Sequence, residues 1–234
     1  MSPRLNELPR RKQRGILMEQ KHSFLRRKRR GIIPYEIKWV LISMLIVIAG
    51  IGFVFSVHPF LAVNQPVPSE ILVTEGWLPD YALVEVKREF ERGKYKYLLA
   101  TGLPLERGSF LSSYKTYAHL AAATLVQLGV EADRVYAVPG RYVENDRTYA
   151  SALSLRQWLE ANTPSAKSIN VASKTVHARR TRLLFQKALG PGISVGVLAL
   201  PDEEYDPACW WRSSAGVKTV LTEGIGYLYA RILQ

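Results

Sequence analysis

A serine, a histidine and an arginine stand close together in the segment Ser173–Arg180. The segment joins an apolar run to a stretch with helical spacing, Val176–Leu189, so it is expected to contain the start of a helix. His177 and Arg180 are three residues apart and share one face of the first turn. Free N–H groups and a partial positive charge make cations unfavourable there unless an anion binds. His177 and Arg180 are therefore predicted to bind an anion, and the alternative is a solvated basic helix face.

Glu75 directly follows a short apolar run, Ile71–Thr74, at the expected mouth of a cleft. A carboxylate in this place can act as a general base, or it can hold a ligand hydroxyl or Arg180. A glutamate that forms only a structural salt bridge would look the same in the sequence, so this alternative stays open for Glu75. Glu75 and His177 are the candidate catalytic residues, because each can accept or donate a proton near neutral pH.

The ligand-binding candidates come from the ends of predicted strands and from the helix starts that follow them. Lys115 and Arg147 would add positive charge at two helix starts, although each by itself is also a common surface residue. Asp202 closes the last strand, where it either accepts a hydroxyl or the His177 N–H, or starts a turn. The predicted ligand-binding set is Gly76, Thr101, Gly102, Lys115, Arg147, Ser173, Arg180 and Asp202.

The sequence lacks the common motifs for cofactors and metals. It contains no GxGxxG, which argues against a dinucleotide site, no GxxxxGK[ST] phosphate loop and no GxSxG nucleophile elbow. No carboxylate cluster and no Cys/His group has the spacing of a metal site. The single cysteine, Cys209, excludes an intramolecular disulfide. Neither a cofactor nor a metal is therefore expected.

Short apolar runs alternate with helical stretches from residue 71 onward. This alternation predicts a Rossmann-like three-layer α/β sandwich with a mostly parallel five-stranded sheet. Ligands of such sheets bind beyond the carboxyl ends of the strands, where the candidate residues stand. Asp146 is the expected N-cap of the third helix, and the last helical region is expected to break near Gly216 or Gly224. The expected strands are Ile71–Thr74, Tyr97–Thr101, Arg134–Val138, Ser168–Ala172 and Val195–Leu200, and the expected helices are Tyr81–Arg92, Ser113–Leu128, Asp146–Ala161, Val176–Leu189 and Trp210–Leu233.

An uncharged apolar stretch, residues 39–57, precedes this domain. Its nineteen residues would form a helix of about 28 Å, close to the hydrocarbon thickness of a bilayer. It is longer than the apolar region of a cleaved signal peptide, so a retained anchor is expected. The predicted organisation is a basic tail (1–38), a transmembrane helix (39–57), a proline-containing linker (58–70) and the α/β domain (71–234).

Most of the net charge of +12 belongs to the tail. Residues 1–38 contain twelve Lys and Arg against three Asp and Glu, a net charge of +9, whereas residues 39–234 contain twenty against seventeen, a net charge of +3. No aromatic residues interleave with the basic run at 26–30, so nucleic acid is not an expected partner. The tail is instead expected in the cytoplasm against anionic lipid, which places the domain on the other side of a bacterial inner membrane.

Taken in order, these segments resemble the YdcF/SanA/ElyC-like family of bacterial envelope proteins, from about Ile71 to the C-terminus. The most specific part of the resemblance is Val171–Ser173, followed by His177, Arg180 and Phe185. Further similarities are Thr101-Gly102, Trp210-Trp211 and Gly216-Val217. The chain departs from the family at its first turn, which reads Glu75-Gly76-Trp77, and at two acidic positions, which are Tyr117 and Ala150. It therefore resembles a divergent subgroup with its own ligand.

The resemblance implies a Rossmann-like sheet and, in anchored members, an extracytoplasmic domain. The leading hypothesis is an envelope-biogenesis protein that binds, and hydrolyses or transfers, a phosphorylated glycan or polyprenyl-phosphate-linked intermediate. One alternative is a nucleotide or S-adenosylmethionine binding domain. Another is a non-enzymatic scaffold that recruits envelope-assembly proteins through its transmembrane helix and Trp210-Trp211.

Overall fold

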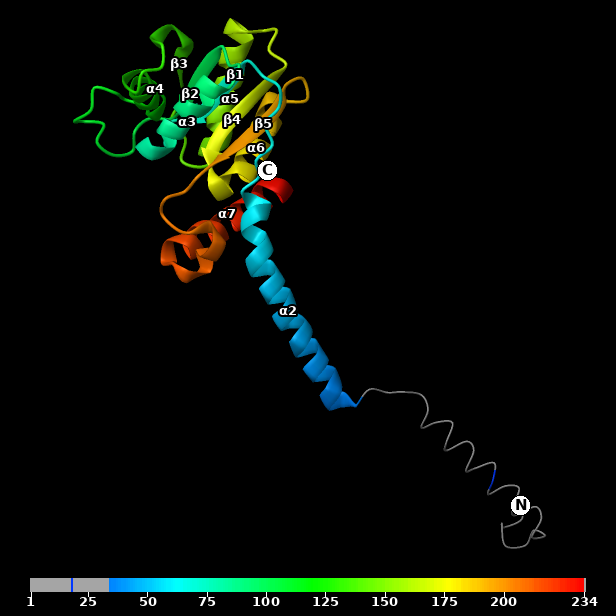
Figure 1. Ribbon diagram of the computed structural model, residues 1–234. Coiled ribbons are helices and arrows are strands. Elements are labelled where there is room, and N and C mark those ends of the chain that lie inside the picture. Colours follow the sequence, from blue (N-terminus) through cyan, green and yellow to red (C-terminus); the bar gives the residue numbers. More distant parts are fainter. Residues whose placement is uncertain (1–17, 19–33, 234) are drawn as a thin grey trace, which may run out of the picture. The chain divides into compact units, whose positions relative to one another are not determined.

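The computed structural model describes residue 18 and residues 34–233 (Figure 1). The chain divides into two compact units, residues 1–51 and residues 52–234. Most of the basic tail lies outside the described residues, and so does its predicted contact with anionic lipid.

A long apolar helix, α2, runs from Tyr35 to Leu61. Its 27 residues span about 40 Å, and its mean hydropathy reaches 2.7 over eighteen residues, so it is long and apolar enough to cross a membrane. The helix extends beyond the expected span of residues 39–57 at both ends. Pro59 lies within its last turn, so the segment expected to be a linker from residue 58 is still helical as far as Leu61.

Five parallel strands form one sheet in the order β3-β2-β1-β4-β5. The chain moves outward from β1 to β3, and then returns to place β4 on the other side of β1. The topological switch point, where ligands of open α/β sheets bind, is therefore between the carboxyl ends of β1 and β4. The strands are β1 (Ile71–Glu75), β2 (Tyr97–Gly102), β3 (Val135–Pro139), β4 (Ser168–Lys174) and β5 (Ser194–Leu200).

Helices cover both faces of this sheet, which confirms the predicted three-layer α/β fold (Figure 1). Alternate residues of each strand point to opposite faces, so Leu72 and Leu98 pack with one pair of helices while Val73 and Leu99 pack with the other. The first pair is α3 (Asp80–Arg92) and α4 (Tyr117–Gln127), and the second is α5 (Arg147–Asn162) and α6 (Ala178–Leu189).

The starts of two helices on the sheet differ in detail from the prediction. The second helix begins at Tyr117 rather than Ser113, because Thr116 caps it by accepting a hydrogen bond from the His119 N–H. Asp146 stands at the N-cap position of α5, but it adopts a left-handed conformation (φ 55°) and its side chain makes no capping hydrogen bond. Asp146 therefore has the predicted N-cap position, but its side chain does not cap the helix.

The last helical region breaks earlier than expected. A 3₁₀ helix, η4 (Pro207–Arg212), is followed by α7 (Ser214–Ile232), which passes through both predicted break points. The break is at Ser213, whose hydroxyl accepts a hydrogen bond from the Gly216 N–H and so starts a new helix.

The segment between α2 and β1 is built into the domain. Gln65 forms an isolated antiparallel bridge with Val197 of β5, and the Asn170 side chain bonds both the N–H and the carbonyl of Val67 at 2.8 Å. Leu61, at the end of α2, is buried in a cluster with Trp210 and Val220.

Candidate active site

Glu75 ends β1 at the switch point and is almost completely buried (3% exposed). Its Oε2 accepts a hydrogen bond of 2.5 Å from the hydroxyl of Ser173, which lies near the end of β4. The Thr181 hydroxyl of α6 lies 3.4 Å from the same oxygen. Ser173 and Thr181 are fully buried and line neither of the two cavities described below, so they orient the Glu75 carboxylate rather than contact a ligand.

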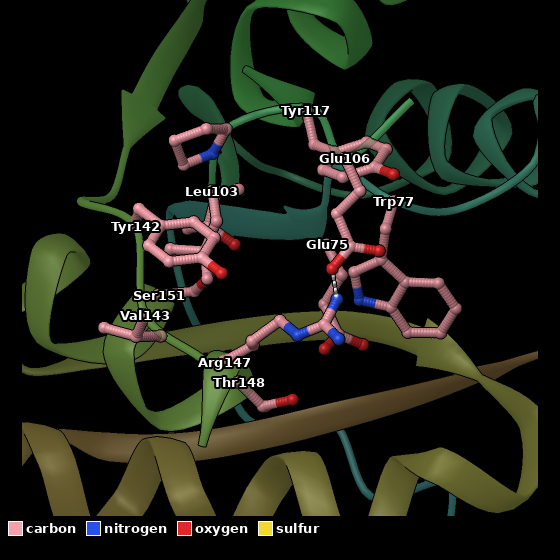
Figure 2. Close-up of a pocket in the computed structure, with 13 residues that line it drawn as sticks. Glu75, Trp77, Leu103, Glu106, Tyr117, Tyr142, Val143, Arg147, Thr148 and Ser151 are labelled. Atoms are coloured by element: carbon pink, nitrogen blue, oxygen red, sulfur yellow. Dashed lines mark hydrogen bonds and ion pairs between the residues drawn. The ribbon is translucent and has the colours of Figure 1, made fainter. Parts of the chain in front are cut away.

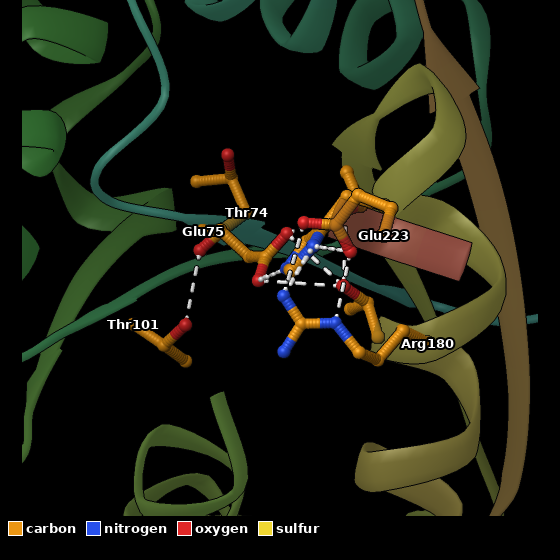
Figure 3. Close-up of polar contacts among 8 residues, drawn as sticks. Thr74, Glu75, Thr101, Arg180 and Glu223 are labelled. Carbon is orange, nitrogen blue, oxygen red and sulfur yellow. Dashed lines mark hydrogen bonds and ion pairs between the residues drawn. The ribbon is translucent and has the colours of Figure 1, made fainter. Parts of the chain in front are cut away.

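His177 lies between two carboxylates. Its Nε2 is 3.3 Å from Oε1 of Glu75, and its Nδ1 is 2.9 Å from Oε2 of Glu223, a residue of α7. Arg180 binds the same Glu223 with two nitrogens, at 2.9 and 3.1 Å (Figure 3). The carboxylates of Glu75 and Glu223 thus neutralise the cations at the start of α6, where the sequence predicted an external anion.

The protonation of this cluster follows from burial and from the charges of its members. Burial alone would lower the pKa of His177, but attraction and hydrogen bonding from Glu75 and Glu223 outweigh it and raise the pKa to about 9. Burial alone would raise the pKa of Glu223, but hydrogen bonds and charges from His177 and Arg180 lower it to about 2. At neutral pH the site therefore holds an imidazolium between the side chains of Glu75 and Glu223.

The local backbone explains why His177 reaches both carboxylates. A 3₁₀ turn, η3 (Thr175–His177), separates β4 from α6, so His177 occupies the N-cap position of α6 instead of its first turn. The ring is buried, and the exposed indole of Trp77 meets it edge-on at 5.3 Å. This turn aims the imidazole at the end of β1, while Arg180 remains one turn further along.

A cavity of about 320 Å³ opens beside Glu75 (Figure 2). Three aromatic side chains, Trp77, Tyr117 and Tyr142, contribute to its wall. Glu106 and Arg147 form an ion pair across its rim, and both are about half exposed. Apart from this pair, the polar residues that line the cavity include Glu75, Thr101, Thr148 and Ser151.

A second, more open cavity of about 690 Å³ shares Trp77, Arg147 and Thr148 with the first. His177, Arg180 and Glu223 form its polar part. Its apolar part comes largely from α7 and α6, and includes Ile225, Tyr229 and Leu184. Glu75 therefore lines the cavity with aromatic walls, whereas His177, Arg180 and Glu223 line the second cavity, which has one apolar end.

Two of the predicted glycines serve the packing of the site. The Gly76 N–H donates a hydrogen bond of 2.6 Å to the Thr101 carbonyl, and a Cβ on Gly76 would lie 2.6 Å from the Tyr117 carbonyl. A Cβ on Gly102 would come within 2.7 Å of the Ala118 nitrogen. Both glycines let the start of α4 approach the sheet, and Gly102 also lines the first cavity.

Two predicted residues lie elsewhere. The Lys115 ammonium donates to the carbonyls of Ser109 and Ser112 and lines neither cavity, so it supports its own loop. Asp202 makes an ion pair with Lys174 at 3.1 Å and accepts from the Glu204 N–H. The proposed contact between Asp202 and the His177 N–H is therefore wrong, and the alternative reading of Asp202 as a turn residue is confirmed.

Sequence reasoning missed Glu223. It is the only acidic residue in α7, and it stands beside Gly224 in an otherwise mostly apolar helix, which is the signal that was available. A lone carboxylate on such a helix needs a partner if it is buried. Its partner cannot be identified from the sequence, because His177 is 46 residues away.

Among residues 34–233, no three His, Cys, Asp or Glu side chains are grouped so that they could hold a metal ion. Comparison of the chain with models of protein families, with curated proteins and with solved structures finds no match. The functional assignment therefore depends on the geometry of the site.

Proposed function

We propose that this protein is a membrane-anchored envelope-biogenesis protein whose extracytoplasmic α/β domain binds, and hydrolyses or transfers, a phosphorylated glycan or polyprenyl-phosphate-linked intermediate. The observation that carries the proposal is the buried carboxylate of Glu75, charge-compensated by His177, at the wall of an aromatic-lined cavity. The resemblance to the YdcF/SanA/ElyC-like family and the apolar helix α2 support the location.

The first cavity suits the glycan part of such a ligand. Its volume of about 320 Å³ is in the range of small-molecule sites, which combine apolar walls with a few placed polar groups. Aromatic rings such as those of Trp77 and Tyr142 can cover the apolar face of a sugar ring. Hydroxyl groups of the sugar would donate to the carboxylates of Glu75 and Glu106, which are acceptors when ionised.

The phosphate part would bind at the junction of the two cavities. Arg147 and Thr148 open α5 and line both cavities, and Asp146 leaves the first N–H groups of the helix without a side-chain cap. A helix start of this kind attracts anions. The ion pair between Arg147 and Glu106 is exposed, and exposed pairs contribute only about 0–1 kcal/mol, so a phosphate can replace Glu106 as the partner of Arg147.

Glu75 is the residue best placed to handle a proton. In hydrolysis it would accept a proton from a water molecule as the water oxygen bonds to the phosphorus, and the leaving oxygen would depart with the electron pair of the broken P–O bond. In transfer, a hydroxyl group of the acceptor would take the place of water. The His177 cation, 3.3 Å from the Glu75 carboxylate, would help to balance the charge of the phosphate group.

The binding test uses the full chain in lipid nanodiscs at low salt, titrated with a hexosamine 1-phosphate, the unphosphorylated hexosamine and inorganic phosphate. We expect the phosphorylated sugar to bind most tightly, and Arg147→Gln to weaken it at least tenfold relative to the unphosphorylated sugar. Lys115→Gln is the matched control, because Lys115 lines neither cavity. No binding of any of the three probes, or equal effects of the two substitutions, would refute the proposal.

The location is tested separately by reporters fused after Gln234. Alkaline phosphatase should be active there, and green fluorescent protein exported by the general secretory route should be dark. The expectation follows from the excess of Lys and Arg before the apolar stretch and the absence of both from residue 39 to residue 86. A bright fluorescent fusion with an inactive phosphatase fusion would place the domain in the cytoplasm and remove the envelope ligand.

A further inference from the structure

One face of α7 is a row of exposed apolar side chains. Leu221, Ile225, Leu228 and Ile232 recur at the spacing of one helix face, and Tyr229 borders them. Ile225 and Ile232 expose 70% and 74% of their surface. Monomeric soluble proteins rarely leave a contiguous apolar strip of this kind in water, so the strip marks a contact surface.

A neighbouring face of α7 packs against the last turns of α2. Val220 is buried in the same cluster as Leu61, and the Tyr227 ring meets the Phe60 ring edge-on at 5.6 Å. Leu61 also approaches the position where a Cβ on Gly224 would stand, at 3.9 Å. The exposed strip is therefore held beside the C-terminal end of a helix that is long and apolar enough to cross a membrane.

Aromatic residues surround this junction. The indole Nε1 of Trp210 donates a hydrogen bond of 3.0 Å to the Val54 carbonyl, and the Trp211 ring packs edge-on against Phe55 at 5.1 Å. Tryptophan rings gather where a membrane meets water, because they have an apolar body and a polar N–H. These contacts connect η4 and the start of α7 to the C-terminal turns of α2, which belong to the same compact unit (residues 52–234).

The charges on α7 favour an anionic surface. Lys218 and Arg231 are exposed, and neither makes an ion pair with an acidic residue of segment 34–233. The single carboxylate of the helix, Glu223, points inward to His177 and Arg180. The outer face of α7 therefore presents apolar and cationic groups together, which is the composition of helices that lie in the surface of anionic membranes.

We propose that α7 lies in the surface of the bilayer that α2 enters, with Leu221, Ile225, Leu228 and Ile232 immersed among the lipids. A second copy of the chain is the less favourable partner for the same strip, because a symmetric pairing of α7 would bring like charges of Lys218 and Arg231 together. An anionic bilayer can bury the apolar strip and bind Lys218 and Arg231 at the same time. The contacts with the end of α2 hold α7 near such a bilayer.

This placement has a consequence for the ligand, which rests on the proposed function. Ile225 and Tyr229 belong both to the strip and to the lining of the second cavity. With α7 on the bilayer, the apolar end of that cavity opens at the lipid surface. The lipid tail of a polyprenyl-linked intermediate would then leave the bilayer along α7, while its phosphate reaches Arg147, which lines both cavities.

The test measures the depth of spin labels on the full chain in vesicles that contain anionic lipid. In a Cys209→Ser background, labels are attached through Leu228→Cys on the strip and through Val126→Cys, an exposed apolar position on α4. We expect the label at 228 to lie about 5–10 Å below the headgroups, with more collisions with oxygen than with a water-soluble nickel chelate. The label at 126 should show the reverse.

Equal exposure of the two labels to the nickel chelate would overturn the proposal. Protection of the label at 228 that vanishes when the labelled chain is diluted with lipid would also overturn it, because a second copy would then cover the strip. No ligand enters this experiment, so its failure leaves the proposed function untouched, and failure of the binding test leaves the membrane contact untouched.

Discussion

Replacing Glu223 by glutamine tests the charge balance of the site most directly. The net rise in the pKa of His177, from 6.5 to about 9, corresponds to about 3.4 kcal/mol at 1.36 kcal/mol per unit. Burial acts against this rise, so the two carboxylates together contribute more than the net amount. If Glu75 and Glu223 contribute equally to the rise in the pKa of His177, Glu223→Gln lowers this pKa by at least about 1.2 units, to below about 8.

Arg180 increases this effect. Its Nη2 lies 3.1 Å from Nδ1 of His177, and Glu223 balances both cations in the native protein. Without that carboxylate, the guanidinium repels a protonated imidazole, which lowers the pKa of His177 further.

The assay is a pH titration of ¹⁵N-labelled histidine side chains by NMR, on the full chain in nanodiscs. The chain has only four histidines, and the His177→Gln variant identifies the signal of interest. Glu106→Gln is the matched control, since Glu106 is an exposed carboxylate that pairs with Arg147. If the pKa of His177 stays above about 8.5 in Glu223→Gln, or falls equally in Glu106→Gln, the electrostatic account of the site is wrong.

The remaining predictions concern stability. The pKa of His177 is higher in the folded domain than in the unfolded chain, so its protonation contributes about 3 kcal/mol to the free energy of unfolding. This contribution is complete below pH 6.5 and is lost as the pH rises through 9. The thermal midpoint should therefore fall over that range in the native chain but not in His177→Gln. A native midpoint that stays constant from pH 6.5 to 10 contradicts this. Gly76→Ala should destabilise the domain by about 1–3 kcal/mol, because its Cβ would meet the Tyr117 and Thr101 carbonyls at 2.6 and 2.7 Å. Gly192→Ala is the control and should change stability little, because no atom lies within 4 Å of the position of its Cβ. Equal denaturant midpoints for the two variants would contradict the packing argument.

The fold could be predicted because its signals are local. Apolar runs such as Ile169–Ala172 and helical spacing such as that of Ala82, Val86 and Phe90 are visible in short windows, and their alternation leaves few alternatives to a parallel sheet. Helix ends were predicted less well. Side-chain caps at Thr116 and Ser213 decide where two helices begin, and several nearby residues have similar capping ability.

The candidate site could be predicted only in part. Glu75, Ser173 and His177 stand at strand ends of the switch point, so their proximity follows from the topology of a parallel sheet. Asp202 also follows a strand, yet Lys174 and the Glu204 N–H hold it elsewhere, because strand β5 is at the edge of the sheet. A position at a strand end selects candidates, but the order of the strands decides which of them meet.

By itself, the sequence determined the α/β class, the apolar helix near the N-terminus and the positions of Glu75 and His177 next to strand ends, since periodicity, composition and strand ends are properties of neighbouring residues. Only the tertiary structure decided the charge state of the site. It brings Glu223 from α7 to His177 and Arg180, so the cations that indicated an external anion are balanced within the chain. A partner 46 residues away is chosen by the packing of α7 against the rest of the domain, and no local pattern contains that choice.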